Sequence, residues 1–68
     1  MKVGEVWKCR KLISENYRAY YFLKEYIGLD NWKALFLLVD EKDNKPTVPH
    51  MTEVSGETLY KECTLDEN

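Results

Sequence analysis

The stretch from Tyr17 to Val39, YRAYYFLKEYIGLDNWKALFLLV, decides the fold. Residues 17–27 are rich in aromatic side chains and alternate, with a mainly apolar set at the odd positions. Residues 28–31, Gly-Leu-Asp-Asn, have the composition of a hairpin loop. Residues 32–39 are apolar at both parities, which is typical of a central strand buried on both faces. The stretch therefore predicts a β-hairpin, with Leu35 and Leu37 in the core and Phe36 and Leu38 at least half covered.

A pair of helices at residues 15–27 and 31–40 is the alternative, and it makes an α+β fold. Ser14 has the chemistry of a helix N-cap and Gly28 that of a residue just past a helix end. Asp30 has the chemistry to cap a second helix. Five of the eleven residues from Tyr17 to Ile27 are aromatic, however, and aromatic residues favour strands over helices. We therefore expect strands.

The flanking segments predict further short strands separated by turns. Val3 to Arg10 has strand composition, with a bend at Gly4, and Leu12 to Asn16 is expected to be a loop. Asp40 to Lys45 is a polar turn closed by Pro46. Thr47 to Val54 is expected to be an edge strand or to carry a bulge, because Pro49 interrupts it.

The C-terminal residues predict one helical turn followed by a last strand. Ser55 is a suitable N-cap, Glu57 lies near the positive end of the helix dipole and Lys61 near its negative end. Leu59 is expected to enter the core, and residues 62–65 to form the final strand. Five short strands with a helical turn before the last predict an all-β domain built as a small SH3-like barrel. In such a barrel the first and last strands lie side by side, which brings Cys9 close to Cys63.

The opening residues Val3-Gly4-Glu5-Val6-Trp7 are similar to the first strand of the Kid/PemK-type toxin ribonucleases, which are small SH3-like barrels. The resemblance implies the barrel fold alone. The arginine-proline stretch that follows in those toxins is replaced here by Lys11-Leu12-Ile13-Ser14, so no ribonuclease residue is implied.

Length and charge limit the kinds of protein to which the chain can belong. Sixty-eight residues are enough for a single small domain, expected to span residues 1–68, and too few for a multidomain enzyme. Nine aromatic residues and eight leucines exclude a disordered tail. The longest apolar run has six residues and no apolar segment follows Lys2, so we expect a cytoplasmic protein without a membrane span or secretory signal.

The charge is divided unevenly along the chain. Residues 1–34 carry a net charge of +3 and residues 35–68 a net charge of −5, for a total of −2. Dedicated nucleic-acid binders usually have a strongly basic face and a pI above about 9, whereas the pI here is about 5.3. Size alone favours an accessory, regulatory or inhibitory protein of the kind often encoded by phages and other mobile elements.

Residues with catalytic or metal-binding chemistry are few. His50 is the only histidine, and the two cysteines show no metal-binding spacing. The turn from Asp40 to Asn44 lacks the glycine of a calcium loop. We therefore expect no catalytic residue, no metal ion, no cofactor and no small-molecule substrate.

The even positions of residues 17–27 are the best candidate for a binding surface. Arg18, Tyr20, Phe22, Lys24 and Tyr26 are expected to project from one side of one strand. Trp32 starts the next strand, so the predicted partner-binding residues are Arg18, Tyr20, Lys24, Tyr26 and Trp32. Aromatic and arginine side chains are enriched in protein interfaces, which predicts a protein partner. Single-stranded nucleic acid is the alternative, since aromatic rings stack on bases and cations bind phosphate.

Overall fold

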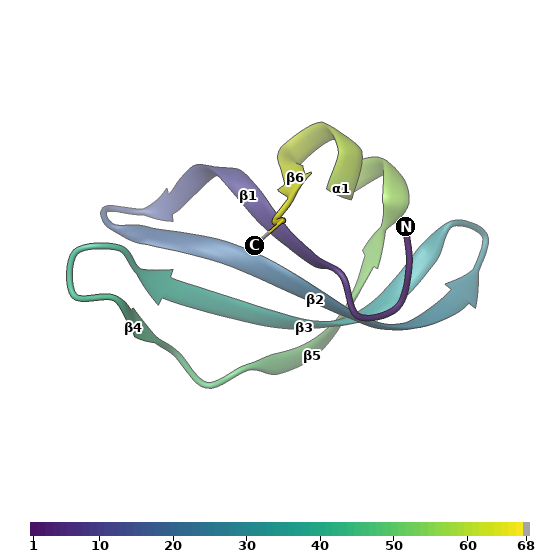
Figure 1. Ribbon diagram of the computed structural model, residues 1–68, viewed down its shortest axis with the longest axis horizontal. Helices are drawn as coiled ribbons and strands as arrows, with labels where there is room; N and C mark the ends of the chain where they lie inside the picture. The colour runs from purple at the N-terminus through teal and green to yellow at the C-terminus, as the bar shows by residue number, and fades with distance from the viewer. Residues whose placement is uncertain (68) are drawn as a thin grey trace.

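The computed structural model describes residues 1–67 and shows a small all-β domain with one short helix (Figure 1). Its elements are β1 (Val6–Ser14), β2 (Tyr17–Gly28), β3 (Asn31–Asp40), β4 (Lys45–Pro46), β5 (His50–Ser55), α1 (Gly56–Glu62) and β6 (Cys63–Leu65). The all-β expectation is thereby confirmed. The two-residue β4 makes six strands where the sequence predicted five.

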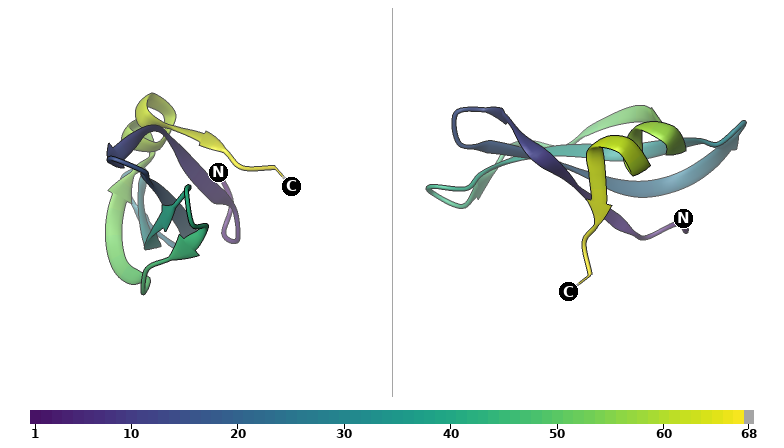
Figure 2. Two further views of the ribbon diagram at one scale, coloured as in Figure 1. Left: turned by 90° about the vertical axis from the view of Figure 1, so that its left-hand side faces the viewer. Right: turned by 90° about the horizontal axis from the view of Figure 1, so that it is seen from above.

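The strands form one antiparallel sheet in the order β4-β3-β2-β1-β6, with β5 also paired to β3. The two long hairpins turn at opposite ends of the molecule, and α1 with β6 lies over β1 (Figure 1). The sheet curves strongly when seen end-on but does not close (Figure 2). The structure therefore does not confirm the predicted SH3-like barrel. The predicted pairing of first and last strands is confirmed, because Cys9 lies opposite Cys63.

Residues 17–40 form the β2–β3 hairpin, and the alternative of helices at 15–27 and 31–40 is wrong. Gly28 pairs with Asn31 across the two-residue loop Leu29-Asp30. Both loop residues have left-handed backbones, with φ of 53° and 58°, as the twist of a tight hairpin requires. The aromatic content of this segment thus outweighs the helix-capping residues at its two ends.

Two expected boundaries differ from the structure. Residues 12–14, expected in a loop, continue β1 with two register shifts against β2, so only Glu15 and Asn16 form the turn. The strand expected from Thr47 begins only at His50, because Pro49 has no N–H to donate to a ladder.

The C-terminal prediction is confirmed closely. Ser55 caps α1, its Oγ accepting a hydrogen bond of 3.1 Å from the Thr58 backbone N–H. Lys61 pairs with Glu57 one turn earlier at 2.9 Å. Leu59 is fully buried, so this short helix seals one side of the core.

The core lies between the sheet and α1. Its buried members are Trp7, Cys9, Ala19, Leu23, Trp32, Ala34, Val54, Leu59 and Cys63. Phe36 and Leu38 pack against this cluster, as expected for partly covered residues. Leu35 and Leu37, predicted to be core, are only half-buried and point to the other face of the sheet. The prediction is wrong because no second layer of residues 1–67 closes over that apolar face, where Pro49 is the one groove-lining residue from outside β1, β2 and β3.

Candidate functional site

The face of the sheet opposite α1 carries an open apolar groove with a volume of about 330 Å³. We call it the groove face. The groove is lined by Val6, Tyr20, Phe22, Leu35, Leu37, Val39 and Pro49. Every lining side chain is aliphatic or aromatic, so the Tyr20 hydroxyl is the one polar side-chain group among them.

Strand register brings these residues together. Val6, Phe22 and Leu35 are successive partners across β1, β2 and β3, and Met51 extends the same row into β5. Paired residues of antiparallel strands project to the same face, so this row forms a continuous apolar ridge. Phe22 is 38% exposed and Met51 53% exposed, so the ridge is open to solvent.

The next row consists of Lys8, Tyr20 and Leu37 across the same three strands. Pro49 completes the groove from the segment before β5. The apolar surface therefore draws on residues far apart in sequence.

The predicted binding surface is divided between the two faces of the sheet. A register shift between Leu23 and Glu25 inserts an extra residue in β2 and reverses which side chains face the core. Tyr26 consequently stacks edge-on against Trp32, with ring centroids 5.0 Å apart. Trp32 itself is 6% exposed and belongs to the core. Tyr20 and Tyr26 thus do not share a face, although the sequence alternation predicted that they would.

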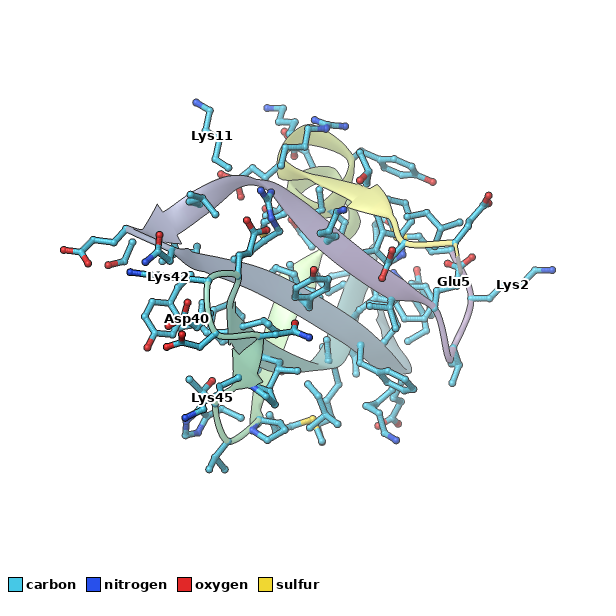
Figure 3. All side chains as sticks on the ribbon, turned by 60° about the vertical axis from the view of Figure 1, so that its left-hand side comes forward. Lys2, Glu5, Lys11, Asp40, Lys42 and Lys45 are labelled. Carbon is cyan, nitrogen blue, oxygen red and sulfur yellow. The ribbon has the colours of Figure 1, made fainter. Side chains whose placement is uncertain are left out.

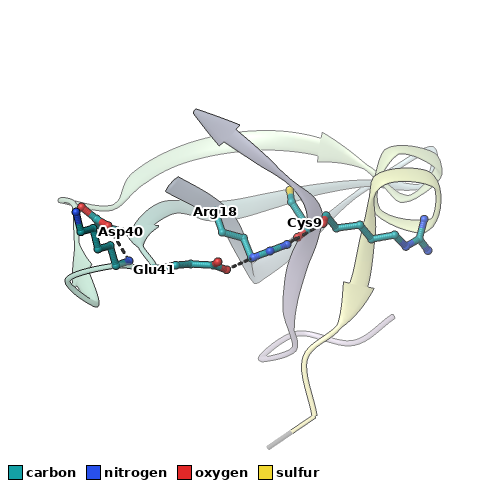
Figure 4. Close-up of polar contacts among 6 residues, drawn as sticks. Cys9, Arg18, Asp40 and Glu41 are labelled. Carbon is teal, nitrogen blue, oxygen red and sulfur yellow. Dashed lines mark hydrogen bonds and ion pairs between the residues drawn. The ribbon is translucent and has the colours of Figure 1, made fainter. Parts of the chain in front are cut away.

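Arg18 is largely occupied by contacts within the protein (Figure 4). Its guanidinium pairs with Glu41 from the β3–β4 turn and donates to the backbone carbonyls of Cys9 and Arg10 at 2.6 and 2.8 Å. The hydrogen bond with Glu41 raises the pKa of Arg18. This predicted site residue therefore connects three segments, and its charge is already balanced.

Tyr20 and Lys24 are the predicted site residues that remain available on the groove face. Burial raises the pKa of the Tyr20 hydroxyl, and the carboxylates of Asp66 and Glu41 raise it further. The hydroxyl is therefore protonated at neutral pH and can donate a hydrogen bond. The Lys24 Nζ lies 5.2 Å from the centroid of the Phe22 ring, at the side of the groove.

Sequence reasoning missed the aliphatic residues that make up most of the groove. The signal was present in residues 32–39, which are apolar at both odd and even positions. Both faces of such a strand need apolar surroundings. Leu35 and Leu37 were predicted to lie in the core because the sequence does not show whether a second layer covers that face.

The structure does not bring His50 together with the two cysteines. Among residues 1–67 no three His, Cys, Asp or Glu side chains are close enough to hold a metal ion. His50 is exposed and pairs with Phe36, at the β3–β5 ladder rather than at the cysteines. No helix in the described part of the chain has the length and hydropathy needed to span a bilayer. No protein-family model, curated protein or solved structure matches this chain.

Proposed function

We propose that this chain is a non-catalytic protein-binding module that takes an apolar segment of a partner protein in the groove between β1, β2 and β3. The partner segment carries aliphatic or aromatic anchor side chains and a carboxylate beside them. The role that fits such a module is regulatory or inhibitory. We also infer that the sheet is a small SH3-like barrel left open, since its first and last strands pair and a helical turn precedes the last.

The observation that carries the proposal is the uncovered apolar lining of the groove. A soluble domain normally buries such a surface, and apolar patches left exposed mark interaction sites. A strand face with Phe22, Leu35 and Leu37 side by side favours contact with another apolar surface. A volume of about 330 Å³ suits a few anchor side chains rather than a whole domain face.

Two lysines near the groove support our proposal that the partner segment carries a carboxylate. Neither Lys8 nor Lys24 takes part in a salt bridge within residues 1–67, whereas Arg18 and Lys61 do. Lys24 lies against Phe22, so a carboxylate next to an anchor side chain meets a cation there. Such a pair at the rim acts mainly on association rate and orientation.

Single-stranded nucleic acid fits this surface less well. Phosphate binding needs free cations beside the stacking rings, and Arg18 is already held by Glu41 and two carbonyls. The exposed ring of Tyr26 lies on the other face, so the predicted row of stacking side chains is interrupted.

A random-peptide selection against the immobilised chain tests the proposal. We expect selected peptides to share apolar anchors with a neighbouring Asp or Glu. Their affinity should fall about tenfold or more for Leu37→Asn, because a groove wall becomes polar. Leu29→Asn is the matched control, since Leu29 is 95% exposed on the β2–β3 turn and outside the groove. Circular dichroism of each variant confirms that the fold is kept.

Three results would contradict the proposal. One is a selection without an apolar consensus, and another is equal loss of affinity in both variants. The third is tight binding of an unstructured oligonucleotide that falls steeply with salt, which would favour the nucleic-acid alternative. If Leu37→Asn does not fold, Phe22→Ser at the more exposed end of the groove replaces it.

A further inference from the structure

A second cavity, of about 370 Å³, lies between β1 and the end of α1. Its lining includes the thiol-bearing Cys9 and the ring of Tyr21. Three cations also line it, namely Arg10, Lys11 and Lys61, against one acid, Glu62. The cavity is thus a cationic recess with a cysteine in its wall, and the groove residues take no part in it.

Cys9 is one half of a thiol pair. It lies directly opposite Cys63 in the antiparallel ladder of β1 and β6, and the two Sγ atoms are 3.4 Å apart. Directly paired residues of antiparallel strands have Cα atoms about 4.5–5.5 Å apart, within the range that a disulfide spans. The backbone is therefore already in position for an S–S bond.

We propose that Cys9 and Cys63 are a reversible modification site at which Cys9 reacts first, through the cationic cavity, with a small disulfide that carries carboxylates. The tripeptide disulfide oxidised glutathione belongs to this chemical class. Cys63 then resolves the mixed disulfide within the same chain.

The order of attack follows from access and from proton affinity. Cys9 lines the cavity and is 8% exposed, whereas Cys63 is 1% exposed and does not line it. Burial, together with the contact to Cys9, raises the pKa of the Cys63 thiol to about 12. A thiol that keeps its proton is not the attacking nucleophile, so Cys63 does not attack first.

The thiol–disulfide exchange takes place in two steps. The Cys9 thiol loses its proton, and its thiolate attacks one sulfur of the small disulfide R–S–S–R. A Cys9–S–S–R bond forms, and the departing RS⁻ takes up a proton. Cys63 then loses its proton and attacks the Cys9 sulfur, which forms the Cys9–Cys63 bond and releases a second RS⁻, protonated in turn. Two protein thiols lose two electrons in total, and R–S–S–R gains them as two RSH.

The surrounding charges select the reagent. Lys61 is paired with Glu57, so the other lining charges, Arg10 and Lys11 against Glu62, leave one net positive charge in the recess. This charge attracts a disulfide that carries carboxylates and raises its local concentration. The side chain of Arg10 is held on the Tyr60 and Lys61 carbonyls at the end of α1, which fixes one of these cations in place. Lys11 projects freely on the same side of the molecule (Figure 3).

Mass spectrometry of the full chain after incubation with oxidised glutathione tests the pairing. We expect the loss of two hydrogens, no retained glutathione and a cross-linked peptide pair containing Cys9 and Cys63. Retained glutathione on the wild-type chain, or only intermolecular dimers, would overturn the proposal.

Two variants test the order of attack. Cys63→Ser should retain one glutathione on Cys9, because nothing resolves it, while Cys9→Ser should stay unmodified over the same time. Equal modification of both variants would refute the leading role of Cys9. Peptide mapping of the folded wild-type chain after treatment with less than one equivalent of reagent gives the same answer without any variant, since Cys9 should carry the first label.

A variant that removes one positive charge tests whether the disulfide reaches Cys9 through the cavity. At low ionic strength Lys11→Gln should slow the reaction with oxidised glutathione roughly threefold, as expected for loss of one charge several ångströms away in water. The rate with uncharged hydroxyethyl disulfide should not change. Lys2→Gln is the matched control, because Lys2 lies at the other end of the molecule (Figure 3). Equal slowing by both variants, or with both reagents, would contradict entry through the cavity.

Discussion

Two leucines on opposite faces of the sheet should respond very differently to truncation. Leu23 in β2 is fully buried in the core beneath α1, whereas Leu37 in β3 is half-buried at the groove. We compare Leu23→Ala with Leu37→Ala because the chemical change is the same and only the surroundings differ.

The expected magnitudes follow from burial. Leu23→Ala removes buried methyl groups and leaves an enclosed void, which costs about 2–5 kcal/mol. Leu37→Ala removes a side chain already in contact with water and leaves no enclosed void, so about 1 kcal/mol is expected from the apolar area alone. A chain of this length has a free energy of unfolding of roughly 3–10 kcal/mol, so Leu23→Ala removes much of it.

Equilibrium urea unfolding measures both values, and an unchanged slope with denaturant shows that the same surface unfolds in each variant. If Leu37→Ala destabilises the chain as much as Leu23→Ala, the groove face is covered in solution. The open groove would then not exist, and neither would the proposed docking site.

Three further results are expected. Ser55→Ala should lower the free energy of unfolding by about 1 kcal/mol, because the Thr58 N–H at the start of α1 loses its acceptor; thermal unfolding measures it. Leu29→Asn should raise stability by about 1 kcal/mol, because φ of Leu29 is 53° and asparagine tolerates a left-handed backbone better than leucine; a lower melting temperature would contradict this reasoning. The free energy of unfolding should fall as pH rises from about 9 toward 12, because the folded state holds the Cys63 proton more tightly than the unfolded state does. The stabilisation from this proton is complete below the pKa of the unfolded state and is lost as the pH approaches the folded-state pKa. The fall should be shallower in Cys63→Ala, as urea midpoints across this pH range would show.

Local chemistry made much of the fold predictable. The turn at residues 28–31, the cap at Ser55 and the buried Leu59 each depend on a few neighbouring residues, and all three are where the sequence placed them. The proximity of Cys9 and Cys63 followed from the pairing of first and last strands, which is present although the sheet stays open.

The candidate site was less predictable because it depends on register between distant strands. One extra residue after Leu23 turns Tyr26 away from Tyr20, and nothing in the local alternation signals it. Whether Leu37 lies inside or at a surface depends on a covering layer, and a sequence does not show that a layer is missing. Trp32 was expected to anchor a partner, yet its size and apolar surface serve the core.

Methyl NMR of the chain titrated with a selected apolar, carboxylate-bearing peptide tests the docking groove most directly. We expect intermolecular nuclear Overhauser effects and saturable shifts at the methyl groups of Leu35, Leu37 and Val39, with those of Leu59 in the core unchanged. Saturable binding whose contacts map elsewhere, or a peptide that leaves the three groove residues unperturbed, would contradict the assignment of this groove as the binding site.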